Sequence, residues 1–366
     1  MIIINWAVLA VLAIVLIAVM LIYIIKRIMN FTFMSKIKNK YLKLLLSFLP
    51  IILLFVIFNM VDAMIVIFHL FIFLVAFDLI NKLFKNKHPN LFGFLAVGVT
   101  IIYLGIGAYL DYTVFETNYD IVTSKDIGFE SFKIIQISDS HIGATFDAKG
   151  FKKHIEKISK IDADIVVITG DFIDDDTSYE DMVKSCEALS LLKPRIGVYF
   201  VYGNHDSGYS NSRGYTAKEL EDELTKNNVF ILKDQISLIN DKIYIVGRLD
   251  RSFNYRKLIK ELVADIEKDK YIIDLNHQPN DFENEEKSGV DLVLSGHSHG
   301  GQIIPLGIIG KLMGENEVYN GLHKRGNTTC IVNSGISNWK VSFKTGTKSE
   351  YSIITIRSTY EENNPL

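Results

Sequence analysis

The sequence predicts an α/β domain that follows a module of four transmembrane helices. Four long apolar stretches fill the first 110 residues, and strand-like runs alternate with amphipathic helical segments from about residue 130 onwards. Charge divides the chain in the same way. Residues 1–110 carry nine Lys/Arg and two Asp/Glu, a balance of +7, whereas the remainder carries thirty and forty, a balance of −10. We therefore expect a membrane part and an acidic soluble part.

The first apolar stretch is long enough to cross a bilayer. Ile2 to Ile25 contains no charged residue, and at about 1.5 Å per residue it would exceed a hydrocarbon core of roughly 30 Å. No charge precedes it and Lys26-Arg27 follows it, which favours a retained anchor over a cleaved signal peptide. The expected boundaries are spans at about 2–25, 44–60, 61–80 and 91–110, a linker at 111–130, the α/β domain at 131–358 and a C-terminal tail at 359–366.

The cations indicate an orientation for these spans. All nine Lys/Arg of the first 110 residues lie in two loops, one between the first and second spans and one between the third and fourth. Loops rich in Lys and Arg stay in the cytoplasm. We therefore expect a multi-pass protein of the cell membrane whose α/β domain is extracytoplasmic and whose first partner is the lipid bilayer.

Three ionisable residues, Asp62, His69 and Asp78, lie within or beside the third span. Such groups are functional candidates by default. Asp62 and Asp78 can instead sit at opposite interfaces, and His69 has no matching partner, so a neutral packing histidine is the favoured interpretation. A channel or transporter would need paired polar residues across several spans, and only the third span offers any.

The α/β domain is predicted from its alternating elements. Strands are expected at Phe132–Ile137, Ile165–Thr169, Val198–Tyr202, Tyr271–Leu275 and Asp291–Ser295. Helices are expected at Ala148–Lys160, Tyr179–Leu192, Ala217–Asn227 and Tyr255–Lys268. Later strands at Gln302–Ile304, Thr329–Asn333 and Tyr351–Arg357 follow one another without helices, which indicates a second sheet packed on the first.

Composition also excludes some functions. An acidic soluble part lacks the basic face that binds a phosphate backbone, so nucleic acid is not an expected partner. The two cysteines, Cys186 in a predicted helix and Cys330 in a predicted strand, have no metal-site spacing and are interpreted as small buried apolar residues.

The sequence contains five short polar motifs, and most of them lie just after a strand-like run. They are Asp139-Ser140-His141, Gly170-Asp171, Gly203-Asn204-His205-Asp206, Asn276-His277-Gln278-Pro279 and Gly296-His297-Ser298-His299. Their side chains offer oxygen and imidazole donors, which hard to borderline divalent cations prefer, and no cysteine is among them. Because strand ends gather at one edge of a sheet, we expect the motifs to form one metal site.

The order and chemistry of these motifs resemble the calcineurin-like metallophosphoesterases, over roughly residues 130–357. The resemblance implies a sandwich of two mixed β-sheets flanked by helices, with two divalent metal ions (Mn, Fe or Zn). The last motif extends to Gly-His-Ser-His-Gly-Gly-Gln at Gly296–Gln302, a form seen in the branch of the family that is often membrane-attached.

The resemblance also implies a role for each motif residue. One metal would be held by Asp139, His141, Asp171 and His299, and the other by Asp171, Asn204, His277 and His297. A hydroxide bridging the two metals would then attack phosphorus. His205 would stabilise the transition state or protonate the leaving group. Asp206 beside it could orient the ring, which is the usual role of a carboxylate behind a catalytic imidazole.

Two arginines beside the motifs are weaker candidates. Arg248 or Arg251 could grip a substrate phosphate through a planar bidentate fork, although solvated arginines at a strand end are an equal alternative. Where the family has Thr or Gly before its fourth-motif histidine, this chain has Asn276.

The predicted function is that of a membrane-anchored phosphohydrolase with two metals. It would cleave phosphodiester, pyrophosphate or phosphomonoester bonds, and spans beside the site favour a lipid-linked or cell-envelope substrate. The alternative is a non-catalytic metal-binding sensor or binding module that kept the fold. The complete ligand set and His205 argue against that alternative.

Overall fold

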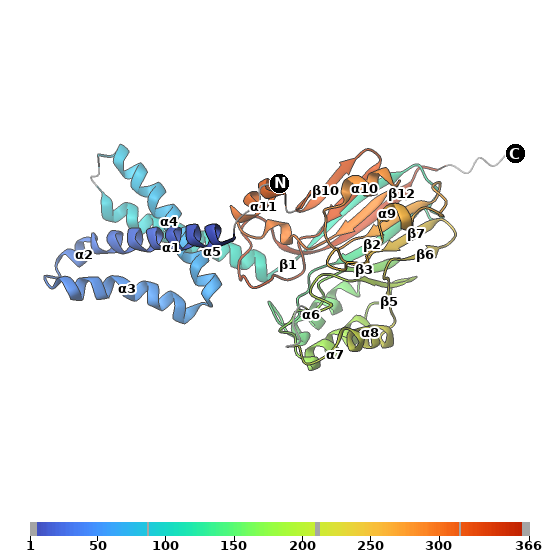
Figure 1. Ribbon diagram of the computed structural model, residues 1–366, viewed down its shortest axis with the longest axis horizontal. Coiled ribbons are helices and arrows are strands. Elements are labelled where there is room, and N and C mark those ends of the chain that lie inside the picture. Colours follow the sequence, from blue (N-terminus) through green and yellow to red (C-terminus); the bar gives the residue numbers. More distant parts are fainter. Residues whose placement is uncertain (1–5, 86–87, 209–212, 315, 361–366) are drawn as a thin grey trace. The chain divides into compact units, whose positions relative to one another are not determined.

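The computed structural model describes residues 6–85, 88–208, 213–314 and 316–360 (Figure 1). The chain forms two compact units, Met1–Gly107 and Ala108–Leu366. Three predicted features fall partly outside the described residues: the start of the first span, Lys87 in the second Lys-rich loop, and most of the C-terminal tail.

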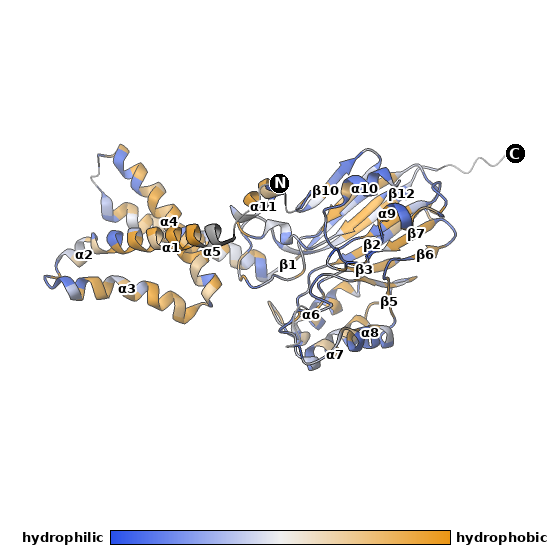
Figure 2. Ribbon diagram, viewed as in Figure 1, coloured by the Kyte–Doolittle hydropathy of each residue, from blue (hydrophilic) through white to orange (hydrophobic). Residues whose placement is uncertain are grey.

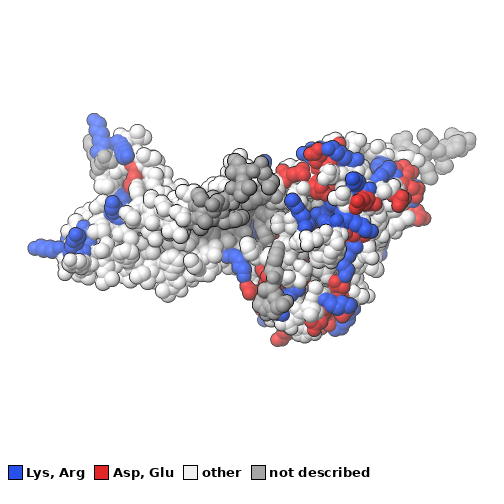
Figure 3. Space-filling view, viewed as in Figure 1, with Lys and Arg blue, Asp and Glu red and all other residues white. Residues whose placement is uncertain are grey.

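The first unit consists of apolar helices. Its elements are α1 (Trp6–Met29), α2 (Thr32–Ser35), α3 (Lys40–Ile57), α4 (Met60–Leu83) and α5 (Pro89–Tyr112). Four of them are long and apolar enough to cross a membrane, within Val11–Met29, Lys40–Ile57, Met60–Leu83 and Pro89–Tyr112. Figure 2 shows that hydrophobic residues dominate these helices, and Figure 3 shows Lys and Arg of this unit in groups apart from a largely uncharged body. The predicted module of four apolar helices is confirmed.

The polar residues of the third span have local partners. Arg27 Nε lies 3.0 Å from Asp78 Oδ1, and the Tyr23 hydroxyl donates to Asp78 Oδ2 at 2.7 Å. His69 is buried, with Nδ1 at 2.8 Å from the carbonyl of Ile65. Asp78 is thus part of an ion pair, and the contact of His69 fits a packing residue.

The second unit contains two six-stranded sheets. The first sheet has the order β1-β12-β2-β3-β4-β5 and the second β10-β11-β9-β8-β7-β6. Their strands are β1 (Val114–Thr123), β2 (Ser131–Ile137), β3 (Ile165–Thr169), β4 (Gly197–Val201), β5 (Val229–Ile231), β6 (Gln235–Ile239), β7 (Ile243–Gly247), β8 (Tyr271–Leu275), β9 (Leu292–Ser295), β10 (Gly321–Arg325), β11 (Thr328–Val332) and β12 (Ser349–Ser358). Both sheets are mixed: β12 runs antiparallel to β2 in the first, and β6 and β10 run antiparallel to their neighbours in the second.

Helices cover the outer face of each sheet. The elements are α6 (Ala148–Ile158), α7 (Tyr179–Leu189), α8 (Ala217–Lys226), α9 (Ile259–Leu262), α10 (Phe282–Lys287), the 3-10 turn η1 (His299–Gly301) and α11 (Leu306–Met313). One apolar core joins α6, α7 and α8 to the first sheet, a second lies between the sheets, and a third joins α9 and α10 to the second sheet. This is the predicted sandwich of two mixed sheets flanked by helices, and it is confirmed.

The predicted linker at 111–130 is wrong over most of its length. All ten residues of β1 pair in parallel with β12, so the second unit begins at Ala108. The reason is that β1 is an edge strand. Its side chains alternate between exposed and partly buried positions and are largely polar, so the apolar run that identifies a central strand is missing.

Two further predicted elements need correction. Of the expected helix Tyr255–Lys268, only Ile259–Leu262 is helical. Val263 just beyond this turn is also buried against the second sheet, so tertiary packing rather than helix propensity sets the length of the element. The expected strand Gln302–Ile304 is absent from the described chain. Gln302 has a φ of 38° and its carbonyl accepts from the Thr345 amide, so the segment turns and joins no ladder.

The motifs stand where the two sheets end. Asp139, Asp171 and Asn204 follow β2, β3 and β4, which are parallel neighbours in the first sheet. His277 and His297 follow β8 and β9, parallel neighbours in the second. Parallel strands deliver their carboxyl ends to the same edge, so each sheet contributes a row of donors.

Candidate metal centre

The turns that carry the donors have unusual backbone conformations. Five of the seven predicted ligands are non-glycine residues with positive φ: Asp139, His141, Asp171, His297 and His299. This left-handed region is uncommon for residues with a Cβ and tends to persist at functional sites.

Glycines let these turns approach one another. A Cβ at Gly203 would lie 2.2 Å from Asp171 Oδ1, and one at Gly296 would lie 2.3 Å from Asp139 Oδ2. No side chain fits there. The glycines that open the third and fifth motifs are therefore required by the packing of the donors.

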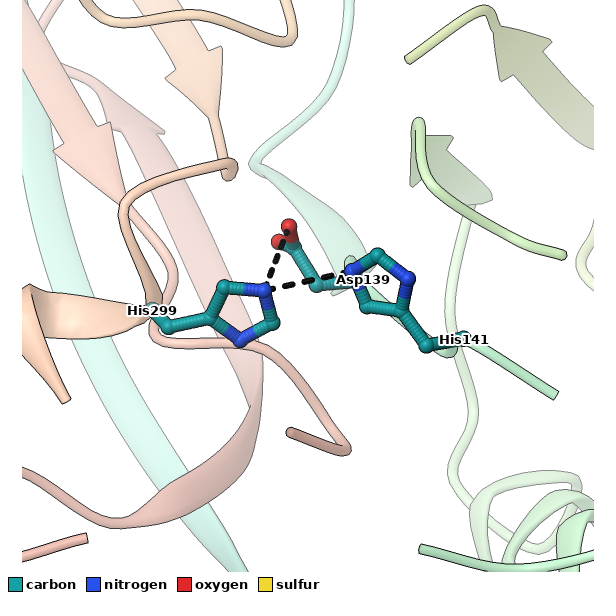
Figure 4. A group of neighbouring side chains, drawn as sticks. All are labelled: Asp139, His141 and His299. Atoms are coloured by element: carbon teal, nitrogen blue, oxygen red, sulfur yellow. Dashed lines mark hydrogen bonds and ion pairs between the residues drawn. The ribbon is translucent and has the colours of Figure 1, made fainter. Parts of the chain in front are cut away.

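One group of donors consists of Asp139, His141 and His299 (Figure 4). His299 Nε2 lies 3.2 Å from His141 Nε2 and 3.6 Å from Asp139 Oδ1. All three residues are buried, and their donor atoms point toward one another. This is the arrangement of side chains that share a cation.

A second group consists of Asp171, His277 and His297. His277 Nε2 lies 3.1 Å from Asp171 Oδ2, and the rings of His277 and His297 are 5.1 Å apart. Asn204 lines a cavity that Asp171 and His297 also line, and its buried Oδ1 accepts no hydrogen bond within the described chain. A side-chain carbonyl in that position is a suitable ligand.

Asp171 lies between the two groups. Its Oδ2 is 3.1 Å from His277 Nε2 and 3.7 Å from His141 Nε2, which belong to different groups. Its other oxygen accepts the His205 amide at 2.8 Å. The bridging position expected for Asp171 is therefore geometrically available.

Two of the imidazoles have a polar neighbour at Nδ1, behind the ring. His277 Nδ1 lies 2.7 Å from the Thr169 carbonyl, and His141 Nδ1 lies 3.4 Å from Asp174 Oδ2. Each contact uses Nδ1 and leaves Nε2 for the centre. Metal-binding histidines are oriented by partners of this kind.

The residues present fit a pair of divalent cations. Asn204 Oδ1 is buried and without a hydrogen-bond partner in the described chain, which is costly unless a ligand satisfies it. Burial lowers the pKa of His297 to about 4, and burial together with the nearby His141 holds the pKa of His299 well below its usual range. Both rings are then neutral, the form that binds metal.

His205 is brought to the centre as predicted, but with a different partner. Its Nδ1 lies 3.1 Å from Asp174 Oδ1, and its ring lines the cavity. Burial lowers the pKa of His205, but the hydrogen bond to Asp174 and the charge of Asp171 outweigh this and raise it overall.

The orienting role predicted for Asp206 is wrong. Its two carboxylate oxygens accept backbone amides of Asp171, Phe172, Ile173 and Gly203, at 2.7–3.2 Å. Asp206 therefore ties the second motif to the third. Sequence reasoning missed Asp174, which orients His205; the only available signal was the acidic run Asp174–Asp176 directly behind Gly170-Asp171.

The prediction that Arg248 binds substrate is also wrong. Its side chain is 1% exposed, and Nη1 lies 2.8 Å from Asp281 Oδ2 and 3.2 Å from Glu285 Oε1. Its positive charge is thus paired with two carboxylates inside the fold. Arg251 lies in an exposed turn and is not among the residues that line the cavity, so its role stays a prediction.

Asn276, which departs from the family pattern, belongs to the same buried cluster. Its amide donates to Glu285 Oε1 at 2.7 Å, and its carbonyl accepts from Arg256 Nη2 at 2.8 Å. The side chain thus points away from the donors, while His277 next to it points toward them.

Five of the seven predicted ligands line a cavity of about 510 Å³, namely His141, Asp171, Asn204, His297 and His299. Besides the predicted residues, its walls include Asp174, Asp175, Trp339 and Lys340. The Trp339 ring lies 5.5 Å from that of His205 and is 42% exposed. The loop that carries it is clamped by the buried ammonium of Lys344, which donates to the carbonyls of Ser334 and Ser337 at 2.8 Å each. Sequence reasoning missed this wall because no motif marks it.

Comparisons with known proteins agree with this site. The sequence model of the calcineurin-like phosphoesterase family matches residues 132–301, the range that contains all seven predicted ligands. The uncharacterized metallophosphoesterase YkuE of Bacillus subtilis is 29% identical over 74% of this chain and 96% of its own length. An uncharacterized metallophosphoesterase of Aquifex aeolicus is 30% identical over 56% of this chain and 78% of its own length.

A vertebrate relative has a descriptive name. A "transmembrane protein with metallophosphoesterase domain" of Danio rerio is 26% identical over 62% of this chain and 53% of its own length.

Proposed function

We propose that the chain, which belongs to the calcineurin-like metallophosphoesterase family and hydrolyses phosphoester bonds, does so as a membrane-anchored enzyme with two metal ions. Its substrate would be a lipid-linked or cell-envelope phosphoester, cleaved at a phosphodiester, pyrophosphate or phosphomonoester bond. The observation that carries this proposal is the position of Asp171, whose Oδ2 lies 3.1 Å from His277 Nε2 in one donor group and 3.7 Å from His141 Nε2 in the other.

Each donor group would hold one cation. Asp139, His141, Asp171 and His299 would bind the first, and Asp171, Asn204, His277 and His297 the second. Mixed oxygen and imidazole sites accept Mn²⁺, Fe and Zn²⁺, so the metal in use would depend on availability. Two such cations, when bound, supply positive charge for the phosphoryl oxygens and lower the pKa of a shared water.

His205 would protonate the leaving group. Asp174 holds Nδ1 at 3.1 Å, which leaves Nε2 for the substrate side of the cavity. From there the imidazole can donate a proton to the oxygen that departs from phosphorus. In this proposal Asp174 is a positioning residue, and Asp206 stabilises the loops that hold the metal ligands.

The membrane location is supported by four apolar helices and by the name of the Danio rerio relative. The Lys-rich loops favour an extracytoplasmic catalytic domain by the positive-inside rule. Gly296–Gln302 has the Gly-His-Ser-His-Gly-Gly-Gln form of the family branch that is often membrane-attached, which agrees with this location.

The connection between the two parts of the chain supports a substrate in the membrane. Only Thr113 separates the last residue of α5 from the first residue of β1. A tether of one residue gives the catalytic domain very little reach away from the bilayer. Phosphoesters within the lipid surface are then the most accessible substrates.

A substrate screen on the full chain tests this function. The protein, reconstituted in nanodiscs and loaded with Mn²⁺, would be assayed against bis-nitrophenyl phosphate, nitrophenyl phosphate, pyrophosphate and a long-chain alkyl pyrophosphate. Asp171→Asn should abolish turnover, whereas Asp222→Asn, at an exposed carboxylate of α8, should not.

The screen also separates the proposal from its alternative. We expect two equivalents of metal and hydrolysis that is fastest with the alkyl pyrophosphate. A protein that binds two metals but hydrolyses none of the four compounds would contradict the proposal. It would favour the non-catalytic sensor or binding module.

A further inference from the structure

Helix α11 exposes an apolar surface in the second unit. Ile308, Ile309, Leu312 and Met313 are 56%, 46%, 83% and 54% exposed, and Figure 2 shows α11 as predominantly hydrophobic. Single exposed apolar residues are ordinary on a soluble domain. Four on one helix of eight residues form a patch that needs an apolar partner.

This patch is attached directly to the metal centre. α11 begins five residues after Gly301, the last residue of η1, and η1 contains the predicted ligand His299. The backbones of Gly301 and Gly307 touch, since a Cβ at Gly301 would lie 2.8 Å from Gly307 Cα. A displacement of α11 would therefore be transmitted to the turn that carries a donor.

A lipid bilayer would provide an apolar partner for such a helix. The same chain carries four helices able to cross a membrane, and one residue separates the last of them from β1. Lys311 lies among the exposed apolar residues of α11, where its ammonium can reach lipid phosphates. Interfacial helices combine an apolar face with cations in this way.

We propose that α11 is an interfacial helix that inserts its four exposed apolar side chains between lipid headgroups beside the metal centre. The contact keeps the turn that carries His299 at the lipid surface and selects phosphoesters within the bilayer over soluble ones. This proposal rests on the membrane location of the proposed function, but it does not require a particular phosphoester bond.

Site-specific labelling of the full chain tests the contact. Both cysteines of the sequence, Cys186 and Cys330, are buried, so Leu312→Cys introduces one accessible thiol. An environment-sensitive fluorophore on this thiol would be measured in phosphatidylcholine vesicles with and without brominated acyl chains. The matched control is Phe230→Cys, because Phe230 is apolar and 55% exposed but lies on β5 at an edge of the first sheet.

We expect blue-shifted emission and quenching by brominated lipid at position 312, with neither at position 230. Equal quenching at the two positions would overturn the proposal. A blue shift at position 312 without quenching would also overturn it, because a protein, such as a second copy of this chain, would then cover the helix. Neither measurement depends on turnover, so an inactive protein would refute the proposed function and leave this result intact.

A double substitution tests the selection of substrate. Leu312→Glu with Met313→Glu should lower hydrolysis of a long-chain alkyl pyrophosphate in vesicles several-fold and leave a short-chain soluble analogue unchanged. An equal loss with both substrates would show that the substitution damages the centre itself and would overturn the selective role of α11.

Discussion

The contact between Asp174 and His205 makes a sharp prediction about turnover. Asp174→Asn keeps the size of the side chain but removes its charge. The Asp174 side chain is 6% exposed, and its two oxygens lie 3.1 Å from His205 Nδ1 and 3.4 Å from His141 Nδ1. Hydrogen bonds to a charged group contribute about 1.5–3 kcal/mol. Since 1.36 kcal/mol corresponds to a factor of ten in rate, we expect kcat to fall by about 10- to 100-fold.

The affinity for metal should change in the same variant. Because Asp174 also lies behind His141, its loss should weaken the metal held by that ring by about 10- to 100-fold, as is usual for partners of ligating histidines. The rate must therefore be measured at saturating metal, with the metal content determined by elemental analysis. If the variant holds two equivalents of metal and still has a lowered kcat, the loss of rate comes from His205 and not from metal lost at His141.

A double-mutant cycle decides whether Asp174 acts through His205. If it does, adding Asp174→Asn to His205→Ala at saturating metal should cause little further loss of kcat. Fully additive losses would refute the reasoning, because Asp174 would then contribute independently of the imidazole.

Three other predictions follow from the site. His205→Ala should retain two metals and lose turnover by about 10²–10⁴-fold, with a smaller loss for a nitrophenyl leaving group; an equal loss for all leaving groups would contradict proton donation. Asp171→Ala should lose both metals, whereas Asp222→Ala should keep them; one metal retained by Asp171→Ala in elemental analysis would exclude a shared ligand. Arg248→Met should lower the free energy of unfolding by about 3–5 kcal/mol, because it leaves buried carboxylates unpaired. The KM of the folded protein should not change. A raised KM without loss of stability in denaturant titration would restore a substrate role for this guanidinium.

The donors could be predicted from the sequence because their positions follow from simple rules. A β-branched run identifies a buried strand, and a polar motif close behind it must emerge at the end of that strand. Asp139, Asp171 and His297 all follow this rule, and the structure brings each of them into a donor group.

The direction of a side chain within a turn could not be predicted in the same way. Asp206 follows His205 directly, yet its oxygens accept backbone amides, and Asp174, more than thirty residues earlier in the sequence, reaches the ring instead. Arg248 failed for a related reason. Its partners Asp281 and Glu285 lie more than thirty residues away, and no sequence pattern shows that they converge.

The position of β12 in the first sheet has a consequence for synthesis of the protein. β12 lies between β1 and β2, and it pairs with β1 across a separation of 235 residues, as Val114 opposite Ser349 shows. During translation β1 leaves the ribosome directly after α5, but β12, which pairs with it, is made after every predicted metal ligand. β1 therefore has an unpaired edge until β12 has been made. The sheet cannot close before β12 is made. A nascent chain that stalls before residue 349 therefore contains all seven predicted ligands but lacks the strand that joins β1 to the rest of the sheet.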